Sequence, residues 1–267
     1  MYGRRAWLSD GRTHEQTATG ARVKKLSDSL VIFAVILAIW QGLYAYAGDV
    51  AISSPLATFR FATVLLTHAP FWNHAAATLQ AFAYALAISA AAGIALGLLL
   101  GLRRFAGDVA EPLLVSLYTI PKVTLYPVML LVFGLGMSAK VAFGVIHGMI
   151  PVILFTLTAV KNIPPVLLRT ARALHLRPLE TATTVLAPAV MPEIITGLRV
   201  GFALTLLGVL IGEMFASQRG LGFLIINGIN SHDVRMTTAV AVIVVVFALF
   251  ANGAMLALDR RVHHARA

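Results

Sequence analysis

The sequence predicts an all-α, polytopic membrane protein with six transmembrane helices, and three observations support that prediction. Hydrophobic residues make up 59% of the 267-residue chain, charged residues only 12%, and the mean hydropathy is +0.85. An average soluble domain is about 25% charged, so this composition argues against a soluble enzyme or a disordered chain. The apolar residues gather in runs long enough to cross a bilayer, and the basic residues gather in alternate connections between these runs.

Six runs meet the requirement of about 20 mostly apolar residues for a spanning helix. We expect spans over 29–47, 75–102, 113–134, 139–160, 194–216 and 237–258. The first run is longer than the apolar part of a signal peptide and no cleavage site follows it, so we expect an uncleaved span. Residues 1–28 are then an N-terminal tail and 29–267 a transmembrane domain, with a short interfacial helix near 56–66 and a long loop over 161–189.

The distribution of basic residues predicts the orientation of these spans. With the N-terminus inside, fifteen Lys and Arg residues fall on the cytoplasmic side, and the outside receives four: Arg60, Lys140, Arg219 and Arg235. Lys122 and Arg199 belong to expected spans and are not counted. The positive-inside rule therefore predicts that both the N-terminus and the C-terminus are cytoplasmic. The formal charge of +10 then reflects topology, not an affinity for nucleic acid.

Glycines at four-residue spacing predict close helix packing, because helices in lipid associate through small residues. They form ridges on three of the expected spans: Gly93, Gly97 and Gly101; Gly144 and Gly148; Gly197, Gly201, Gly208 and Gly212. Packing within one chain is the favoured interpretation. A dimer interface along one of the ridges is the alternative, and spacing alone does not separate the two.

The third and fifth expected spans hold the candidate residues for a translocation path. Pro121 and Pro127 interrupt the third span, and Lys122 lies between them at membrane depth. A lysine there is costly unless it faces a polar path or the bundle interior, so Lys122 either attracts an anionic solute or caps the backbone of a broken helix. Glu213 lies near the outer face on the fifth span. It is a candidate for the outer mouth of the path or for a structural hydrogen bond to a neighbouring loop.

The long loop over 161–189 reads as two short amphipathic helices. Pro164 and Pro165 open the first, and Pro178 opens the second. The helical spacing predicts two apolar stripes: Leu167, Ala171 and Leu174 on the first helix, and Leu179, Ala182 and Leu186 on the second. Such a pair lies in the lipid headgroups or docks in a groove of a soluble partner, and composition does not choose between these.

Three segments of the chain resemble a known family. RTARALHLRPLETATTVLAPAVMPEIITGLRVG (169–201) resembles the cytoplasmic EAA loop of binding-protein-dependent ABC importer permeases. IPKVTLYPVMLLVFGLGMSAKV (120–141) and GEMFASQRGLGFLI (212–225) are similar to segments of the nitrate/sulfonate/taurine-type permeases. The resemblance covers about residue 75 to the C-terminus. It implies a type I ABC importer permease fold and a multi-pass location in the cytoplasmic (inner) membrane.

The resemblance also implies a function and a set of partners. The chain is then the permease subunit of an ATP-driven importer, which translocates a small organic or inorganic anion, such as a sulfonate or nitrate, delivered by an extracytoplasmic solute-binding protein. It implies a homodimer in membrane lipid with two cytoplasmic ABC ATPase subunits, and no nucleic acid partner. A coupling helix in the loop reaches into the ATPase, with these residues in the coupling segment: Val166, Leu167, Arg169, Ala171, Arg172, Leu174 and His175. Here Arg169 stands at the family's glutamate and His175 at its glycine.

Nothing in the sequence calls for catalysis by this chain. It has no G-x-x-x-x-G-K-[ST] segment, so we expect ATP and Mg²⁺ to bind the partner ATPase and no cofactor to bind here. It has no cysteine and no H-E-x-x-H segment, so no metal site is expected, and His147 is interpreted as a hydrogen-bonded packing residue. The alternative function is a stand-alone secondary transporter driven by an ion gradient. Such transporters often have broken helices in two related halves, and only one broken span is found here.

Overall fold

The computed structural model describes residues 10–264, with side chains described over 27–256 except at Ala216. The chain divides into two compact units, Met1–Arg60 and Phe61–Ala267. Within the described residues every regular element is helical, which confirms the all-α prediction. Three of the basic residues assigned to the inside, Arg4, Arg5 and Arg266, lie outside the described residues.

The first unit is a long helix followed by a turn and the start of a short helix. Helix α1 spans Asp10–Ala47, and its apolar part, Ser27–Ala47, is long enough to cross a membrane. Trp40 Nε1 donates a hydrogen bond of 3.0 Å to the carbonyl of Ser53, which folds the connection back on the end of α1. Helix α2 follows over Pro55–Thr67 and continues into the second unit, where the sequence predicts an interfacial helix.

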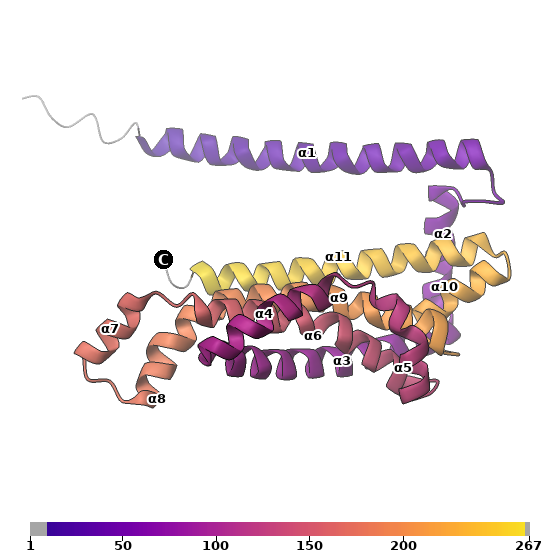
Figure 1. The fold of residues 1–267 in the computed structure, drawn as a ribbon. Coiled ribbons are helices and arrows are strands. Elements are labelled where there is room, and N and C mark those ends of the chain that lie inside the picture. The colour runs from indigo at the N-terminus through magenta and orange to yellow at the C-terminus, as the bar shows by residue number, and fades with distance from the viewer. Residues whose placement is uncertain (1–9, 265–267) are drawn as a thin grey trace, which may run out of the picture. The chain divides into compact units, whose positions relative to one another are not determined.

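The second unit is a helical bundle (Figure 1). Its elements are α3 (Ala69–Leu102), α4 (Arg104–Thr119), η1 (Lys122–Leu125), α5 (Tyr126–Phe133), α6 (Met137–Lys161), α7 (Pro165–Ala173), α8 (Pro178–Glu180), η2 (Thr181–Leu186), α9 (Ala187–Ala216), α10 (Leu221–Asn230) and α11 (Val234–His264). Within the described residues of the whole chain, five helices are long and apolar enough to cross a membrane, and the bent pair of α4 with η1–α5 makes six if it is one span. Five of the six predicted spans are therefore single helices, and the third corresponds to the bent pair.

Helix α6 lies at the centre of the bundle, packed against α3 on one side and α9 on the other. A Cβ added to the α3 glycines would touch α6 at these pairs: Gly93 with Val152, Gly97 with Thr156, and Gly101 with Val160. The residue numbers of the paired positions increase together along both helices, so α3 and α6 run in the same direction. The glycine ridge on α3 therefore packs within the chain, as the favoured interpretation holds.

Helix α9 runs antiparallel to α6, because the contact partners now move in opposite directions. A Cβ on Gly212 would lie 3.0 Å from Lys140 Cα near the start of α6, whereas one on Gly197 would lie 2.6 Å from Phe155 Cβ near its end. A Cβ on Gly201 would likewise lie 3.0 Å from the carbonyl oxygen of Gly148. Small residues on both helices let the two backbones approach closely, which is how helices pack without a hydrophobic drive.

The third expected span is a bent pair of helices, not a single helix over 113–134. Helix α4 already begins at Arg104, and its axis meets that of η1–α5 at 87° across the break at Ile120 and Pro121. Pro121 thus breaks the span as predicted, but Pro127 does not interrupt it. Pro127 lies in the first turn of α5, where the missing amide hydrogen costs nothing. Because α3 and α6 are parallel, the bent pair must carry the chain back across the bundle.

The first half of the long loop after α6 agrees with its prediction, and the second half differs from it. Helix α7 begins at Pro165 as expected. The second helix is not separate, because α8 continues through the π-helical turn η2 into α9 and gives one apolar helical run over Pro178–Phe215. The expected stripe on it does not form a buried face, since Leu179 is 75% exposed and Ala182 is also exposed. Helix α10 was not predicted at all.

Candidate functional site

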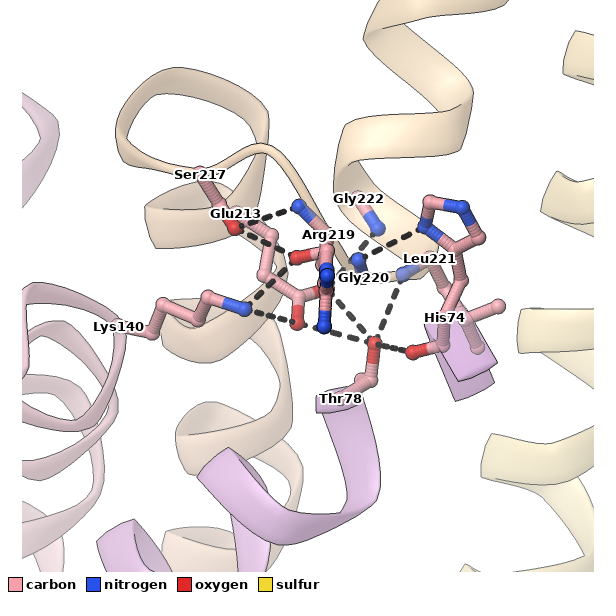
Figure 2. A network of polar contacts seen from close by, with 9 residues as sticks. All are labelled: His74, Thr78, Lys140, Glu213, Ser217, Arg219, Gly220, Leu221 and Gly222. Atoms are coloured by element: carbon pink, nitrogen blue, oxygen red, sulfur yellow. Dashed lines mark hydrogen bonds and ion pairs between the residues drawn. The ribbon is translucent and has the colours of Figure 1, made fainter. Parts of the chain in front are cut away.

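The ends of the bundle hold the two sets of residues that matter for function. At one end, a network of polar contacts joins α3, α6, α9 and the start of α10 (Figure 2). We call it the Glu213 network, and it consists of His74, Thr78, Lys140, Glu213, Ser217, Arg219, Gly220, Leu221 and Gly222. At the other end lies the segment over 161–186 that holds α7, α8 and η2.

Glu213 is the centre of this network and is fully buried. Its carboxylate accepts hydrogen bonds from Thr78 Oγ1 at 2.8 and 3.0 Å and from the Gly222 amide at 3.0 Å. Lys140 Nζ lies 3.4 Å away and supplies the opposite charge. A buried carboxylate is tolerated only when it is paired and hydrogen-bonded in this way. The carboxylate of Glu213 therefore accepts a hydrogen bond from the first turn of α10, and its role at the outer mouth of a path stays a prediction.

Lys140 is the main residue that the sequence analysis misplaced. It was counted among the outside charges although the expected span over 139–160 includes it, and it lies in the first turn of α6 with 3% of its surface exposed. Besides Glu213, its ammonium donates a 2.7 Å hydrogen bond to the carbonyl of Arg219. A signal for its burial was present, because Lys140 precedes Gly144 and Gly148 at four-residue spacing. It therefore shares the α6 face that packs against α9.

The loop between α9 and α10 is held over Glu213 by its own backbone. The Gly220 amide donates to His74 Nδ1 at 3.2 Å, and the Leu221 amide donates to Thr78 Oγ1 at 2.8 Å. Gly220 has a φ of 131°, and a Cβ at this position would collide with the Glu213 carboxylate. Only glycine fits both requirements. The last loop residue and the first residue of α10 are thus both hydrogen-bonded to α3, which fixes the end of the loop there.

Lys122 is buried at the bend between α4 and η1 and is not part of the Glu213 network. Its ammonium donates a 3.1 Å hydrogen bond to the carbonyl of Tyr118 and lies 5.2 Å from the centroid of that ring. Tyr118 lies in the last turn of α4, where carbonyls lose their helical donors. This is the geometry of the backbone-capping interpretation. The role of Lys122, Pro121 and Pro127 in a translocation path stays a prediction.

At the opposite end, α7 presents a mixed surface. Ala171 is 3% exposed and Leu167 is half-buried, so these two members of the expected stripe face the protein. The third, Leu174, is 65% exposed, as is Val166 at 61%, and Arg169 and Arg172 are exposed with them. Apolar and basic side chains are therefore both available at this surface.

His175 ends α7 in the left-handed region, with a φ of 48°. The Leu176 amide donates to the Ala171 carbonyl at 3.1 Å, which closes the last turn of the helix. This is the position at which the resembled family has a glycine, and left-handed backbone is the reason that glycine suits it. Histidine keeps the same turn here, at a backbone conformation that costs a residue with a Cβ about 1–2 kcal/mol.

His147 behaves as a packing residue. It is 7% exposed, and its Nδ1 lies 2.8 Å from the carbonyl of Phe143 one turn earlier on α6. A Cβ on Gly208 would lie 2.9 Å from its ring, so the imidazole fills the space between α6 and α9. This agrees with the hydrogen-bonded packing role expected from the sequence.

A bundle of apolar helices that are long enough to span a bilayer, with a fixed loop at one end and an exposed short helix at the other, defines a polytopic membrane protein. Residues 93–264 match the family model described as "Binding-protein-dependent transport system inner membrane component". The chain belongs to this family, and it is the permease subunit of an ABC importer, located in the inner membrane. The resemblance seen in the sequence is thereby confirmed, and the family is one of transport permeases, not enzymes.

Relatives with assigned names agree with this family. A probable ABC transporter permease protein of Haemophilus influenzae is 31% identical over 84% of this chain and 92% of its own length. The nitrate import permease protein NrtB of Leptolyngbya laminosa is 31% identical over 79% of this chain and 78% of its own length. The taurine transport system permease protein TauC of Escherichia coli is 28% identical over 72% of this chain and 70% of its own length. These matches favour the importer over the secondary transporter considered as the alternative.

Proposed function

We propose that this permease translocates a small organic or inorganic anion, such as a sulfonate or nitrate, delivered by an extracytoplasmic solute-binding protein. Relatives named for nitrate and taurine transport support the choice of an anion. In this proposal the permease is a homodimer that carries two cytoplasmic ABC ATPase subunits, and ATP with Mg²⁺ binds those subunits. Both termini and the α7 end of the bundle face the cytoplasm, and the Glu213 network faces outward.

The observation that supports coupling is the exposed surface of α7. Val166 and Leu174 are exposed apolar residues, Arg169 and Arg172 are exposed cations, and no acidic residue occurs over 162–179. A short helix of this kind suits a groove in a soluble partner with acidic walls. We propose that the coupling segment docks in such a groove of the ATPase, and that its contacts differ between the two states of the ATPase.

Charge reversal of Arg169 and Arg172 together tests the docking. Arg169→Glu with Arg172→Glu places like charges against an acidic groove, and we expect binding of the ATPase to weaken about tenfold, which corresponds to about 1.4 kcal/mol. Co-purification of the ATPase and ATP-driven uptake in proteoliposomes measure the effect. Arg235→Glu is the matched control, because Arg235 is exposed at the start of α11, at the opposite end of the bundle. A second variant replaces residues 166–176 with a glycine-serine linker. If this variant still co-purifies with the ATPase and still drives uptake, the coupling assignment is wrong.

Lys122→Met tests the proposed role of Lys122 on the anion path. Loss of the only charge in this bend is expected to lower anion uptake about tenfold, while the permease still assembles with its partners. Lys122→Arg is the matched control, because it keeps both the charge and a donor for the Tyr118 carbonyl. If the Lys122→Met variant takes up the anion as fast as the unmodified chain, Lys122 is not part of the path. Its only role is then to cap the backbone.

A further inference from the structure

A mouth opens at the Glu213 end of the bundle, and none of the described residues that line it is acidic. Two adjoining cavities of about 470 and 630 Å³ meet there, and they share Ala77, Gln80 and Arg219. Asn73 and His74 add polar groups to the first cavity, and Ser217 with Gln218 adds them to the second. A concave surface lined by cationic and neutral polar groups raises the local concentration of anions.

The acid nearest to this mouth does not cancel its positive charge. Glu213 is fully buried beneath the loop, and its carboxylate is occupied by Lys140, Thr78 and the Gly222 amide. Glu213 and Lys140 therefore neutralise one another inside the network. The guanidinium of Arg219 is exposed, and among the described side chains none forms a hydrogen bond or an ion pair with it. Arg219 supplies the charge that remains at the mouth.

The backbone of Arg219 is held firmly although its side chain is not engaged. Its carbonyl accepts hydrogen bonds from Lys140 Nζ at 2.7 Å and from Ser217 Oγ at 2.5 Å, and its amide donates to Ser217 Oγ at 3.0 Å (Figure 2). The next residue, Gly220, is tied to His74. A cation on a fixed backbone loses less freedom when it binds a ligand, which favours specific binding.

We propose that Arg219 captures the anionic solute at this mouth before it enters the bundle. A guanidinium is planar and always charged, and its N–H groups match two oxygens of a sulfonate, nitrate or carboxylate at once. The amides of Gln80 and Asn73 supply neutral donors to the same space. Arg219 is thus a specificity-determining residue of the import path, an inference that rests on the anionic solute proposed above.

Protection from an arginine reagent tests the site directly. The purified permease–ATPase complex is treated with phenylglyoxal, and the rates of modification of Arg219 and Arg235 are followed by mass spectrometry in the same digest. Sodium methanesulfonate or sodium nitrate is added at constant ionic strength. An anion at about four times its dissociation constant is expected to slow modification of Arg219 about fivefold, with the rate at Arg235 unchanged. A rate at Arg219 that follows the rate at Arg235 at every anion concentration overturns the proposal.

Measuring anion uptake by variants is the second test of the proposal. In proteoliposomes with the binding protein at saturation, Arg219→Gln is expected to lower anion uptake about tenfold, Arg219→Lys to lower it less, and Arg235→Gln to leave it unchanged. If Arg219→Gln instead weakens capture of the solute-loaded binding protein while anions give no protection, Arg219 is a docking contact and the proposal is wrong. If anions protect Arg219 but the unmodified complex imports none of them, the capture site stands and the proposed anionic solute fails.

Discussion

Glu213→Leu is expected to destabilise the permease by about 3–5 kcal/mol, the range found when one partner of a buried ion pair is removed. The variant leaves the Lys140 ammonium without its counter-charge in a site where that residue is 3% exposed. It also removes the Glu213 acceptor from the Thr78 hydroxyl, which keeps its 3.3 Å hydrogen bond to the His74 carbonyl, and from the Gly222 amide, which then stays buried and unpaired. Unfolding of the detergent-solubilised protein, followed by circular dichroism against temperature or added SDS, measures the loss.

A double variant separates the ion pair from the packing around it. Lys140→Met combined with Glu213→Leu removes both charges and replaces them with apolar groups of similar volume, so most of the lost stability is expected to return. The stability that does not return reflects two lost hydrogen bonds. The Arg219 carbonyl loses its bond from Lys140, and the Gly222 amide loses its bond to Glu213. A double variant as unstable as Glu213→Leu alone shows that the buried charge of Lys140 is not the cause.

Gly97→Leu is expected to cost about 3 kcal/mol, the upper part of the range for overpacking. A Cβ on Gly97 would lie 2.5 Å from Thr156 Cβ and 2.9 Å from the carbonyl oxygen of Ile153. A side chain can rotate away, but a backbone oxygen cannot, so α3 and α6 must separate. Since α6 also packs against α9, the separation disturbs the centre of the bundle. The same unfolding assay measures this effect, together with the yield of monodisperse protein.

Gly253→Leu is the matched control for this prediction. Gly253 lies in α11, which also spans the apolar region, and a Cβ there would meet no atom within 4 Å. Its replacement is expected to change stability by less than about 0.5 kcal/mol, as for surface positions in general. Equal losses for Gly97→Leu and Gly253→Leu mean that the close approach of α3 to α6 does not explain the effect.

The parts of the fold that were predicted correctly depend on local rules. Apolar length located the five spans that are single helices, because each must cover the bilayer regardless of its neighbours, but it did not show that the third expected span is a bent pair. Glycines at four-residue spacing identified the faces of α3, α6 and α9 that pack closely, because small residues on one helix face let backbones approach, but they did not show which helices pair. Proline predicted the start of α7 at Pro165 and the break at Pro121, since both depend on a missing amide hydrogen.

The parts that were missed depend on partners far away in the chain. The first half of α4 reads as a polar connection because it holds Asp108 and Glu111. In the structure both carboxylates bind Lys161 at the end of α6, at 2.6 and 2.7 Å. Lys140 reads as a loop charge until Glu213, 73 residues later, is placed beside it. Thr78 was overlooked for the same reason, because one hydroxyl in a span says nothing until its acceptor is known.

The π-helical turn η2 has a consequence for how α8 and α9 are oriented about their common axis. Each residue of an α-helix advances by about 100° and 1.5 Å, and a π-helical turn holds one residue more than an α-helical turn. The side chains of α8 are therefore out of phase with a pattern extrapolated from α9, and Leu179 on α8 is 75% exposed. One residue fewer over 181–186 would turn α8 by about 100° relative to α9. The length of this one turn thus sets which residues of α8 are presented at the end of the bundle where we propose that the ATPase docks.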